Sequence, residues 1–306
     1  MNNPVYHIPA MLPECMEALN IKPVGTYVDA TFGGGGHSRA IMERLGPGGR
    51  LFSFDQDRDA LANRIDDTRF TFVLGNFRYL SNFLRYYGVD RVDGILADLG
   101  VSFHHFDASE RGFSFRSDAP LDMRMNREAP LTAAQFINTA SADELTAVLR
   151  NFGDIKRPAP FVKAILARRD SEPIETTGEL LALISPLVNP RQEKKELAQI
   201  FQALRIHVNR ETEALQRFLL ETVRVLRPGG RLAVLTYHSL EDRMVKNFIK
   251  TGNLEGRLEK DFFGRPLTPW KDISRGAIAP SPQEVEANPR ARSAKLRVAE
   301  LLTENS

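Results

Sequence analysis

Cysteine and tryptophan each occur only once in the 306 residues, and no apolar run approaches the length of a membrane-spanning helix. The single cysteine, Cys15, excludes an internal disulfide and fits a reducing compartment. The longest apolar runs, such as Leu232–Leu235, are far shorter than the roughly 20 residues that cross a bilayer. The first ten residues lack the basic and apolar segments of a secretory signal. We therefore expect a cytoplasmic protein with no membrane partner.

Net charge is also small, at +2, although the charges are unevenly distributed. Residues 1–149 carry a net charge of −5, whereas residues 150–210 carry +4 and residues 243–297 carry +6. A polyanionic partner would meet the later segments first, and a chance distribution of solvated charges is the alternative. Hydrophobic residues make up 42% and charged residues 26% of the chain, which excludes disordered and fibrous proteins.

Strand-like and helix-like runs alternate in the first hundred residues. The predicted strands are Thr26–Ala30, Arg50–Asp55, Phe70–Leu74 and Gly94–Asp98. The predicted helices between them are Ser38–Leu45, Arg58–Ile65 and Leu80–Tyr87. This alternation predicts a parallel sheet with helices on both faces. The strand pattern returns at Arg231–Tyr237, after an Arg-Pro-Gly-Gly turn.

Between about residue 109 and residue 209 no strand pattern of comparable quality occurs. The helical patterns found there are Ala133–Ile137, Asp143–Leu149, Phe161–Arg169, Thr177–Leu187 and Glu193–Asn209. We therefore predict one domain of residues 1–108 and 210–306, interrupted by an inserted all-helical domain of residues 109–209. A single larger domain with helical decoration is the alternative. Five prolines between residues 264 and 289 predict an irregular loop.

The strongest local signal is the segment VDATFGGGGHS, at Val28–Ser38. A predicted strand ends there, the four glycines Gly33–Gly36 follow, and a helix begins near His37. Glycine permits positive φ and lets a ligand approach the backbone, so the run predicts a binding loop for a nucleoside-containing cofactor. A plain tight turn is the alternative. Asp55 ends the second predicted strand 22 residues after Gly33, where a carboxylate can accept hydrogen bonds from ribose hydroxyls.

Two cofactor classes share this arrangement. A dinucleotide typically requires GxGxxG, and Ser38 occupies the third glycine position of that motif. S-adenosyl-L-methionine carries an ammonium group, which Asp29 is placed to bind. The segment Val225–Ser239 resembles the fifth strand of doubly wound adenosylmethionine-dependent methyltransferases, and the sequence shows no Tyr-x-x-x-Lys proton relay for hydride chemistry. These features favour adenosylmethionine over a nicotinamide dinucleotide.

Six motifs extend over nearly the whole chain: DATFGGGGHS (Asp29–Ser38), ADLGVS (Ala97–Ser102), ERGFSFRSDAPLDMRM (Glu110–Met125), FQALRIHVN (Phe201–Asn209), YHSLEDRMVK (Tyr237–Lys246) and NPRARSAKLRVAE (Asn288–Glu300). Together they resemble the bacterial small-subunit ribosomal RNA N(4)-cytidine methyltransferase family. The resemblance implies a doubly wound α/β fold of the class I adenosylmethionine-dependent methyltransferases, with an inserted all-helical domain that recognises RNA. It further implies methylation of the exocyclic amine of a cytidine in the decoding region of 16S rRNA.

The resemblance also implies which residues bind the cofactor: Gly35, Gly36, His37, Asp55, Phe77 and Asp98. His105 stands where the family normally has Gln, and Phe103 replaces a usual Ser, so His105 is the weaker candidate. We expect Phe77 to pack on the adenine, with a place in the hydrophobic core as its alternative.

The cytosine amine is a poor nucleophile, so the reaction needs an acceptor for its protons. Asp98, at the end of the fourth predicted strand, is the best-placed acceptor, and contact with the cofactor alone is its alternative role. Tyr237, His238 and Ser239 follow the last predicted strand. We expect His238 to accept a proton or contact the base, and a structural histidine is the alternative.

A cytidine must leave its stack to react, which is easiest in single-stranded or loop RNA. Two basic clusters are candidates for phosphate binding, with solvated or ion-paired arginines as the alternative. They are Arg290, Arg292, Lys295 and Arg297, and Arg111, Arg116, Arg124 and Arg127. We therefore expect small ribosomal subunit RNA to be the partner, bound by a monomer or homodimer.

DNA amino-methyltransferases carry an Asp/Asn/Ser-Pro-Pro-aromatic motif where this chain has Asp98-Leu99-Gly100-Val101, which disfavours a DNA substrate. No pair of the six histidines has the spacing of a zinc motif, so we expect no metal site. A non-catalytic RNA-binding assembly factor that retains the fold is the alternative function.

Overall fold

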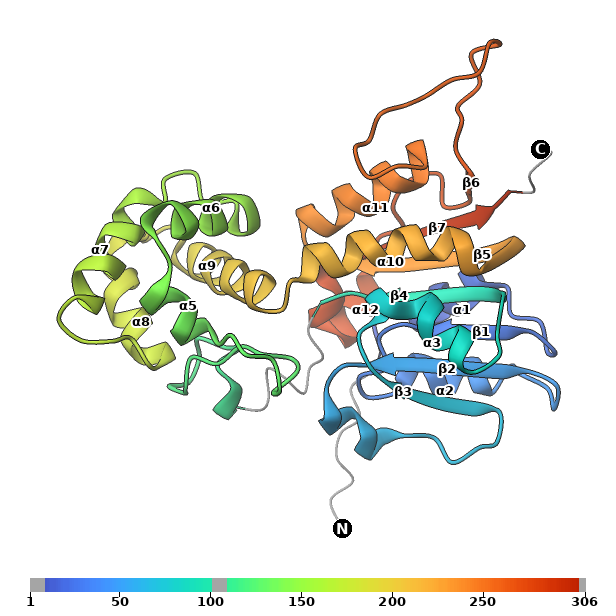
Figure 1. Ribbon diagram of the computed structural model, residues 1–306, viewed down its shortest axis with the longest axis horizontal. Coiled ribbons are helices and arrows are strands. Elements are labelled where there is room, and N and C mark those ends of the chain that lie inside the picture. Colours follow the sequence, from blue (N-terminus) through green and yellow to red (C-terminus); the bar gives the residue numbers. More distant parts are fainter. Residues whose placement is uncertain (1–8, 101–108, 303–306) are drawn as a thin grey trace. The chain divides into compact units, whose positions relative to one another are not determined.

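The computed structural model describes residues 9–100 and 109–302 (Figure 1). The chain divides into two compact units. The sheet unit comprises Met1–Gly100 and Thr212–Ser306, and the helical unit comprises Val101–Glu211. Each unit has its own hydrophobic core.

The sheet unit contains a seven-stranded sheet in the order β3-β2-β1-β4-β5-β7-β6. Its strands are β1 (Thr26–Asp29), β2 (Arg50–Asp55), β3 (Phe70–Leu74), β4 (Val92–Asp98), β5 (Leu226–Thr236), β6 (Trp270–Asp272) and β7 (Lys295–Leu301). Strands β1 to β5 pair in parallel, and β7 lies antiparallel between β5 and β6. The strand order reverses between β1 and β4. In open α/β sheets, ligands bind beyond the carboxyl ends of the strands at such a reversal.

Helices cover both faces of this sheet. One face packs against α1 (Leu12–Leu19) and α2 (Gly36–Met42). The other packs against α3 (Leu80–Tyr86), α10 (Glu211–Val225) and α11 (Ser239–Thr251). Burial on both faces explains why the central strands are continuously apolar rather than alternating. A last short helix, α12 (Pro282–Ala287), precedes β7.

The helical unit packs its apolar residues into one core. Its helices are α5 (Ala133–Thr139), α6 (Ala142–Gly153), α7 (Ala159–Arg169), α8 (Thr177–Ile184) and α9 (Glu193–Val208). Capping boxes begin α5, α6 and α8, with a Ser or Thr side chain accepting from the backbone N–H three residues later and a Gln or Glu returning the bond. These reciprocal hydrogen bonds fix where each helix starts. The predicted strands and helices of both units otherwise form close to their predicted positions.

The structure corrects the sequence-based elements in three places. Arg58–Asn63 forms a 3-10 turn, η1, because the segment buries only Ala60 and lacks the apolar face that stabilises an α-helix. The Pro-Gly-Gly turn lies within β5, where Gly229 has a φ of 76° and the register with β4 shifts. The proline-rich segment predicted to be irregular contains β6 and α12. Among the described helices, none is both long and apolar enough to span a membrane.

Candidate active site

Loops and side chains from four neighbouring strands meet at the carboxyl edge of the sheet, where the strand order reverses. The glycine loop follows β1, Asp55 ends β2, Asp98 ends β4 and Tyr237 follows β5. Because parallel strands place their carboxyl ends on one edge, these groups from distant parts of the chain lie along the same edge of the sheet. The predicted site residues Gly33, Gly35, Gly36, His37, Asp55 and Asp98 all lie at this edge.

The glycine loop has a fixed backbone conformation. Gly33 and Gly35 adopt φ values of 52° and 76°, in the left-handed region that favours glycine. A Cβ on Gly35 would lie 2.8 Å from the Phe32 ring, and one on Gly36 would lie 2.9 Å from Pro9. A Cβ on Gly34 would meet no atom within 4 Å. Glycine is therefore required at positions 35 and 36, whereas position 34 has room for a side chain.

Two N–H groups of this loop are already committed within the protein. Gly33 donates to Asp55 Oδ2 at 2.9 Å, and Gly35 donates to the Phe32 carbonyl at 2.8 Å. A pyrophosphate depends on free N–H groups at such a loop. The loop's hydrogen bonding and the acidic side chains beside it therefore favour a cationic ligand over a dinucleotide.

Asp29 has a different position from the one that the sequence predicts. Its side chain is 0% exposed, and it accepts hydrogen bonds from Ser38 Oγ at 2.6 Å and from the Thr31 N–H at 3.1 Å. Burial raises its pKa, while the neighbouring His37 and the Ser38 hydroxyl act in the opposite direction. Because the Asp29 side chain has no exposed surface, its predicted contact with an ammonium group finds no support in the structure and stays a prediction. Through its hydrogen bond with Ser38, Asp29 links the first turn of α2 to the end of β1.

Asp55 and Phe77 remain partly exposed at the neighbouring strand ends. Asp55 accepts from the N–H groups of Gly33 and Asp57, each at 2.9 Å, so it also holds the glycine loop. Phe77 begins the 3-10 turn η2 (Phe77–Tyr79), and its ring meets the buried Phe218 ring edge-on at 5.1 Å. Phe77 thus packs on the core with one side of its ring and retains exposed surface.

Asp98 is the centre of a cluster of polar groups. Its Oδ1 accepts a 2.7 Å hydrogen bond from the Tyr237 hydroxyl, and its Oδ2 lies 3.8 Å from His37 Nδ1. The Asp98 N–H donates to Thr31 Oγ1 at 2.6 Å. The side chain keeps 23% of its surface exposed, whereas His37 is 5% exposed, with Nε2 3.1 Å from the Ala10 carbonyl. Asp98 is therefore held in one orientation and remains accessible.

The surroundings of Asp98 shift its proton affinity. Burial raises the pKa of Asp98, while His37 and the Tyr237 hydrogen bond favour the ionised form. Burial and the adjacent Asp98 raise the pKa of Tyr237 far above its usual value, so Tyr237 stays a neutral donor. A carboxylate that is fixed by one donor and has a raised pKa is suited to accept a proton or a hydrogen bond from a substrate.

His238 is placed as a helix cap. Its Nδ1 accepts from the Glu241 N–H at 3.5 Å at the start of α11, and its Nε2 lies 2.9 Å from Glu241 Oε1. Glu241 also accepts from the Tyr237 N–H at 3.2 Å. These contacts favour the structural alternative for His238. His105, the other predicted histidine, lies outside the described residues.

Tyr237 and Glu241 had no predicted role. Tyr237 and Asp98 are 139 residues apart, so no local pattern could pair them. Glu241 had a local signal, because an acidic residue three positions after a capping residue is typical of a helix start.

At least four of the eight side chains in the two predicted basic clusters bond to other groups of the protein. Arg111 is 3% exposed and donates to the carbonyls of Arg124 and Met125. Arg124 pairs with Asp122 at 2.7 Å. Lys295 and Arg297 both pair with Asp242, at 3.2 and 2.7 Å. These contacts favour the paired alternative for these four basic residues, and phosphate binding by them stays a prediction. The exposed members of the two clusters are Arg116, Arg127, Arg290, Arg292 and Lys295.

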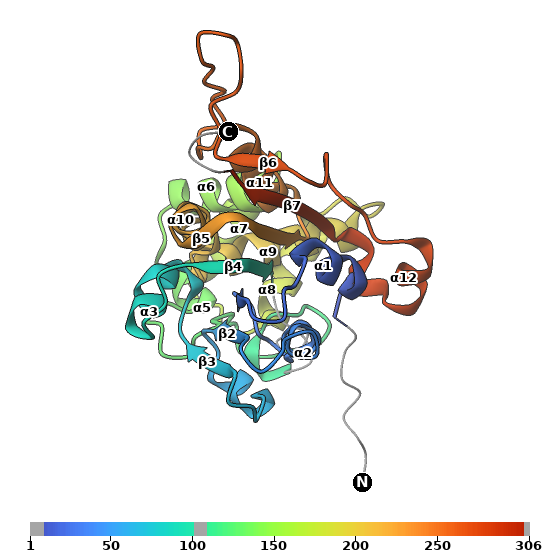
Figure 2. The same cartoon turned by 90° about the vertical axis from the view of Figure 1, so that its right-hand side faces the viewer.

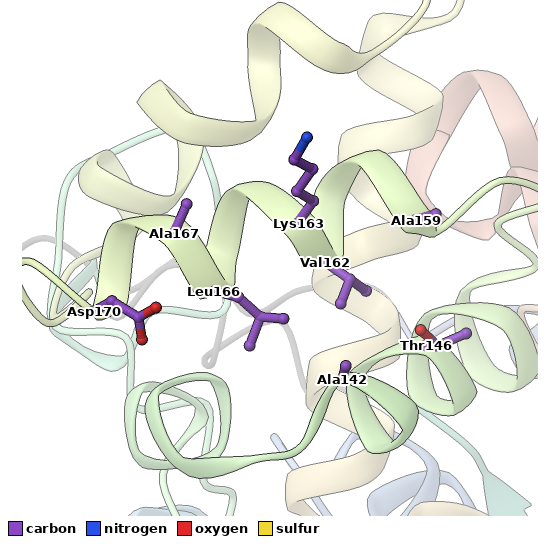
Figure 3. A pocket seen from close by; sticks show the side chains of 8 residues that line it. All are labelled: Ala142, Thr146, Ala159, Val162, Lys163, Leu166, Ala167 and Asp170. Carbon is purple, nitrogen blue, oxygen red and sulfur yellow. The ribbon is translucent and has the colours of Figure 1, made fainter.

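A pocket of about 500 Å³ lies between α6 and α7 in the helical unit (Figure 3). Lys163 and Asp170 are its charged lining residues, and Thr146 adds a hydroxyl. The remaining lining residues are Ala142, Ala159, Val162, Leu166 and Ala167. The pocket contains none of the predicted site residues.

A sheet of five parallel strands with an antiparallel β7 between β5 and β6 is the fold of class I adenosylmethionine-dependent methyltransferases. The glycine loop and acidic strand ends at the reversal of strand order are where such enzymes hold their cofactor. Residues 4–302 match the MraW methylase family, and the chain belongs to this family.

Relatives named "Ribosomal RNA small subunit methyltransferase H" are similar along nearly the whole chain. The relative from Bacteroides thetaiotaomicron is 57% identical over 295 residues, covering 96% of this chain and 97% of its own. The relative from Porphyromonas gingivalis strain W83 is 55% identical over 301 residues, covering 97% of each chain. Among solved structures, an rRNA methylase from Streptococcus thermophilus is similar with a TM-score of 0.40 and 13% identity, covering 95% of each chain.

Proposed function

We propose that this protein transfers a methyl group from adenosylmethionine to the exocyclic N(4) amine of a cytidine in the decoding region of 16S rRNA. The observation that carries the proposal is the position of the Asp98 carboxylate. It is partly exposed at the reversal of strand order, and Tyr237 fixes its orientation. Membership of the MraW methylase family and relatives named for the small ribosomal subunit support it.

The residues at the strand ends fit the cofactor. Adenosylmethionine, when bound, supplies a methyl group on a positively charged sulfonium. The partly exposed carboxylates of Asp55 and Asp98 suit a cation that also carries ribose hydroxyls. Gly35, Gly36 and the buried His37 give the loop its shape, and Phe77 offers the exposed part of its ring to the adenine.

The main difficulty of the reaction is the weak nucleophilicity of the cytosine amine, and Asp98 is placed to increase it. A carboxylate that accepts an amine hydrogen raises electron density on nitrogen and takes up the proton as the N–C bond forms. The bond between the methyl carbon and the sulfonium sulfur would break in the same step, with S-adenosyl-L-homocysteine as the neutral leaving group. Tyr237 orients that carboxylate by donating to Oδ1. Holding the base in line with the methyl group contributes further, up to about 7–11 kcal/mol in favourable cases.

The helical unit is the proposed RNA-recognition part of the molecule. The whole unit has no net charge, but residues 150–210 within it carry +4, and this basic segment is the part that attracts a polyanion. We further infer that the protein acts in the cytoplasm on small-subunit rRNA, as a monomer or homodimer.

Methyl transfer to isolated small subunits tests the proposed function. Purified protein and labelled adenosylmethionine are incubated with subunits from cells that lack the modification, and nuclease fragments are analysed by mass spectrometry. We expect one methyl group on N(4) of a decoding-region cytidine. Label at another base, or no label from folded and cofactor-binding protein, would contradict the proposal.

Tyr237→Phe tests the positioning of Asp98. The phenol hydrogen bond stabilises the ionised carboxylate, so its loss raises the pKa of Asp98 further. Activity depends on the ionised form, and the acidic limb of the kcat–pH profile should therefore move to higher pH. The rate on the alkaline side of that limb should fall less than the rate on its acidic side. An unshifted acidic limb would show that Tyr237 does not act through Asp98.

His238→Asn separates a helix cap from a catalytic histidine. Asparagine is a good N-cap residue, so the free energy of unfolding of the variant should stay within about 1 kcal/mol of the wild-type value. We expect its kcat to stay within threefold, whereas His238→Ala should lower the melting temperature. A kcat reduced by about 10²-fold or more in a stable His238→Asn variant would restore the catalytic role.

A further inference from the structure

Residues 257–267, between α11 and β6, form a hairpin that we term the aromatic hairpin. Asp261 and Arg265 are joined by a 2.9 Å backbone hydrogen bond, and Leu267 donates to the Glu259 carbonyl at 2.8 Å. The Asp261 carboxylate accepts from the N–H groups of Phe263 and Arg265, each at 2.8 Å. Gly264 closes the turn with a φ of 82°. The tip therefore has a defined conformation.

This defined tip exposes two aromatic rings. Phe262 is 97% exposed and Phe263 is 79% exposed, with ring centroids 5.6 Å apart and planes at 87°. Neither ring belongs to a hydrophobic core of the described residues. Rings this exposed gain little free energy from burial on folding, and adjacent exposed apolar side chains on an ordered turn are typical of a binding surface.

The hairpin carries three cations against the two acidic residues Glu259 and Asp261, a net charge of +1. Arg257, Lys260 and Arg265 are exposed, and none of their side chains forms an ion pair with the described part of the chain. The Arg265 guanidinium lies 5.9 Å from the centroid of the Phe263 ring. Aromatic rings that stack on bases, flanked by cations that contact phosphates, are typical of surfaces that bind single-stranded nucleic acid.

The aromatic hairpin lies far from Asp98 within the sheet unit. Helix α11 begins beside Tyr237 and leads away for 13 residues, which is about 20 Å of helix. The hairpin then leads into Trp270, which pairs with Leu301, next to the strand end where Arg231 pairs with Glu300. That end is opposite to the carboxyl edge. Figures 1 and 2 show the segment between α11 and β6 projecting beyond β6, the edge strand of the sheet.

We propose that the aromatic hairpin binds a single-stranded segment of small-subunit rRNA remote from the methylated cytidine. Unpaired bases stack on Phe262 and Phe263, and the three neighbouring cations contact the phosphates. The inference rests on the proposed function for its substrate. Two copies meeting tip to tip would bury only the two rings of each hairpin, and four aromatic side chains supply far less than the roughly 1,200 Å² buried by a stable interface.

Phe262→Ala/Phe263→Ala tests the hairpin through substrate affinity. With unmodified small subunits as substrate, we expect KM to rise about tenfold to a hundredfold while kcat stays within twofold. Phe262→Leu/Phe263→Leu keeps apolar surface but removes stacking, and should raise KM comparably. Tyr86→Ala removes another exposed aromatic ring, 81% exposed on α3, and should leave KM unchanged.

The dissociation constant for fluorescently labelled, protein-free 16S rRNA is measured in parallel. It should rise in both double variants, and exchanging the three cations for Gln should weaken its salt dependence. An unchanged KM and dissociation constant in the alanine variant would overturn the proposal. Wild-type affinity in the leucine variant would also overturn it and indicate an apolar protein partner. Failure of the wild type to methylate any subunit would contradict the proposed function, while the binding measurement still tests the hairpin.

Discussion

Asp98→Asn should lower kcat for methyl transfer by about 10²–10⁴-fold, the usual contribution of a positioned proton acceptor. The amide keeps the shape of the side chain and can still accept from Tyr237, but it cannot take up a proton. Because burial raises the pKa of Asp98, the ionised form opposes folding above that pKa, and protonation relieves this cost. The neutral amide should therefore leave the melting temperature unchanged or higher.

The matched control for this variant is Asp90→Asn, an exposed aspartate just before the other end of β4. Its kcat and melting temperature should equal those of the wild type. Steady-state kinetics and thermal unfolding, measured together, separate lost chemistry from lost structure. A stable Asp98→Asn protein with full activity would show that the carboxylate serves only to bind the cofactor or has no role.

Gly35→Ala should weaken adenosylmethionine binding by about tenfold to a hundredfold. The residue has a φ of 76°, and its Cβ would come within 2.8 Å of the Phe32 ring and 2.7 Å of Arg39 Nη1. Strain of this kind costs about 1–3 kcal/mol and persists only if the loop keeps its shape. The loop should relax and lose the conformation that binds the cofactor. Isothermal titration with adenosylhomocysteine measures the change.

Gly34→Ala is the control from the same loop, because its Cβ would meet no atom within 4 Å. We expect its affinity for adenosylhomocysteine to stay within threefold of the wild type. Equal affinities for all three proteins would show that the loop conformation does not determine cofactor binding. An equal loss in both variants would point to a close backbone contact at position 34 instead of strain at position 35.

The core of the fold could be predicted because its signals are local. Strands β1 to β4 are short apolar runs bounded by turns, and the helical unit has helix periodicity and no strand pattern. The sequence did not reveal that β7 lies antiparallel between β5 and β6, because strand order depends on contacts between distant segments. It likewise gave no sign of the aromatic hairpin, since exposure depends on what the rest of the chain leaves uncovered.

The sequence predicted which residues form the candidate site better than it predicted what each of them contacts. Glycine runs and strand-end carboxylates are visible in the sequence, so Gly35, Asp55 and Asp98 were identified as a group. Asp29 has the same sequence signal as Asp98 but is completely buried, because α2 and Ser38 cover it. Only the packing of a helix over a strand end separates a structural carboxylate from an accessible one.

Mass spectrometry of decoding-region rRNA tests the central claim most directly. Cells that lack the protein are complemented with the wild type or with Asp98→Asn at matched expression, and the methylation of the cytidine N(4) is quantified. We predict complete methylation with the wild type and a large loss with Asp98→Asn. An N(4) methyl group that persists without the protein, or is restored fully by the variant, would contradict the account.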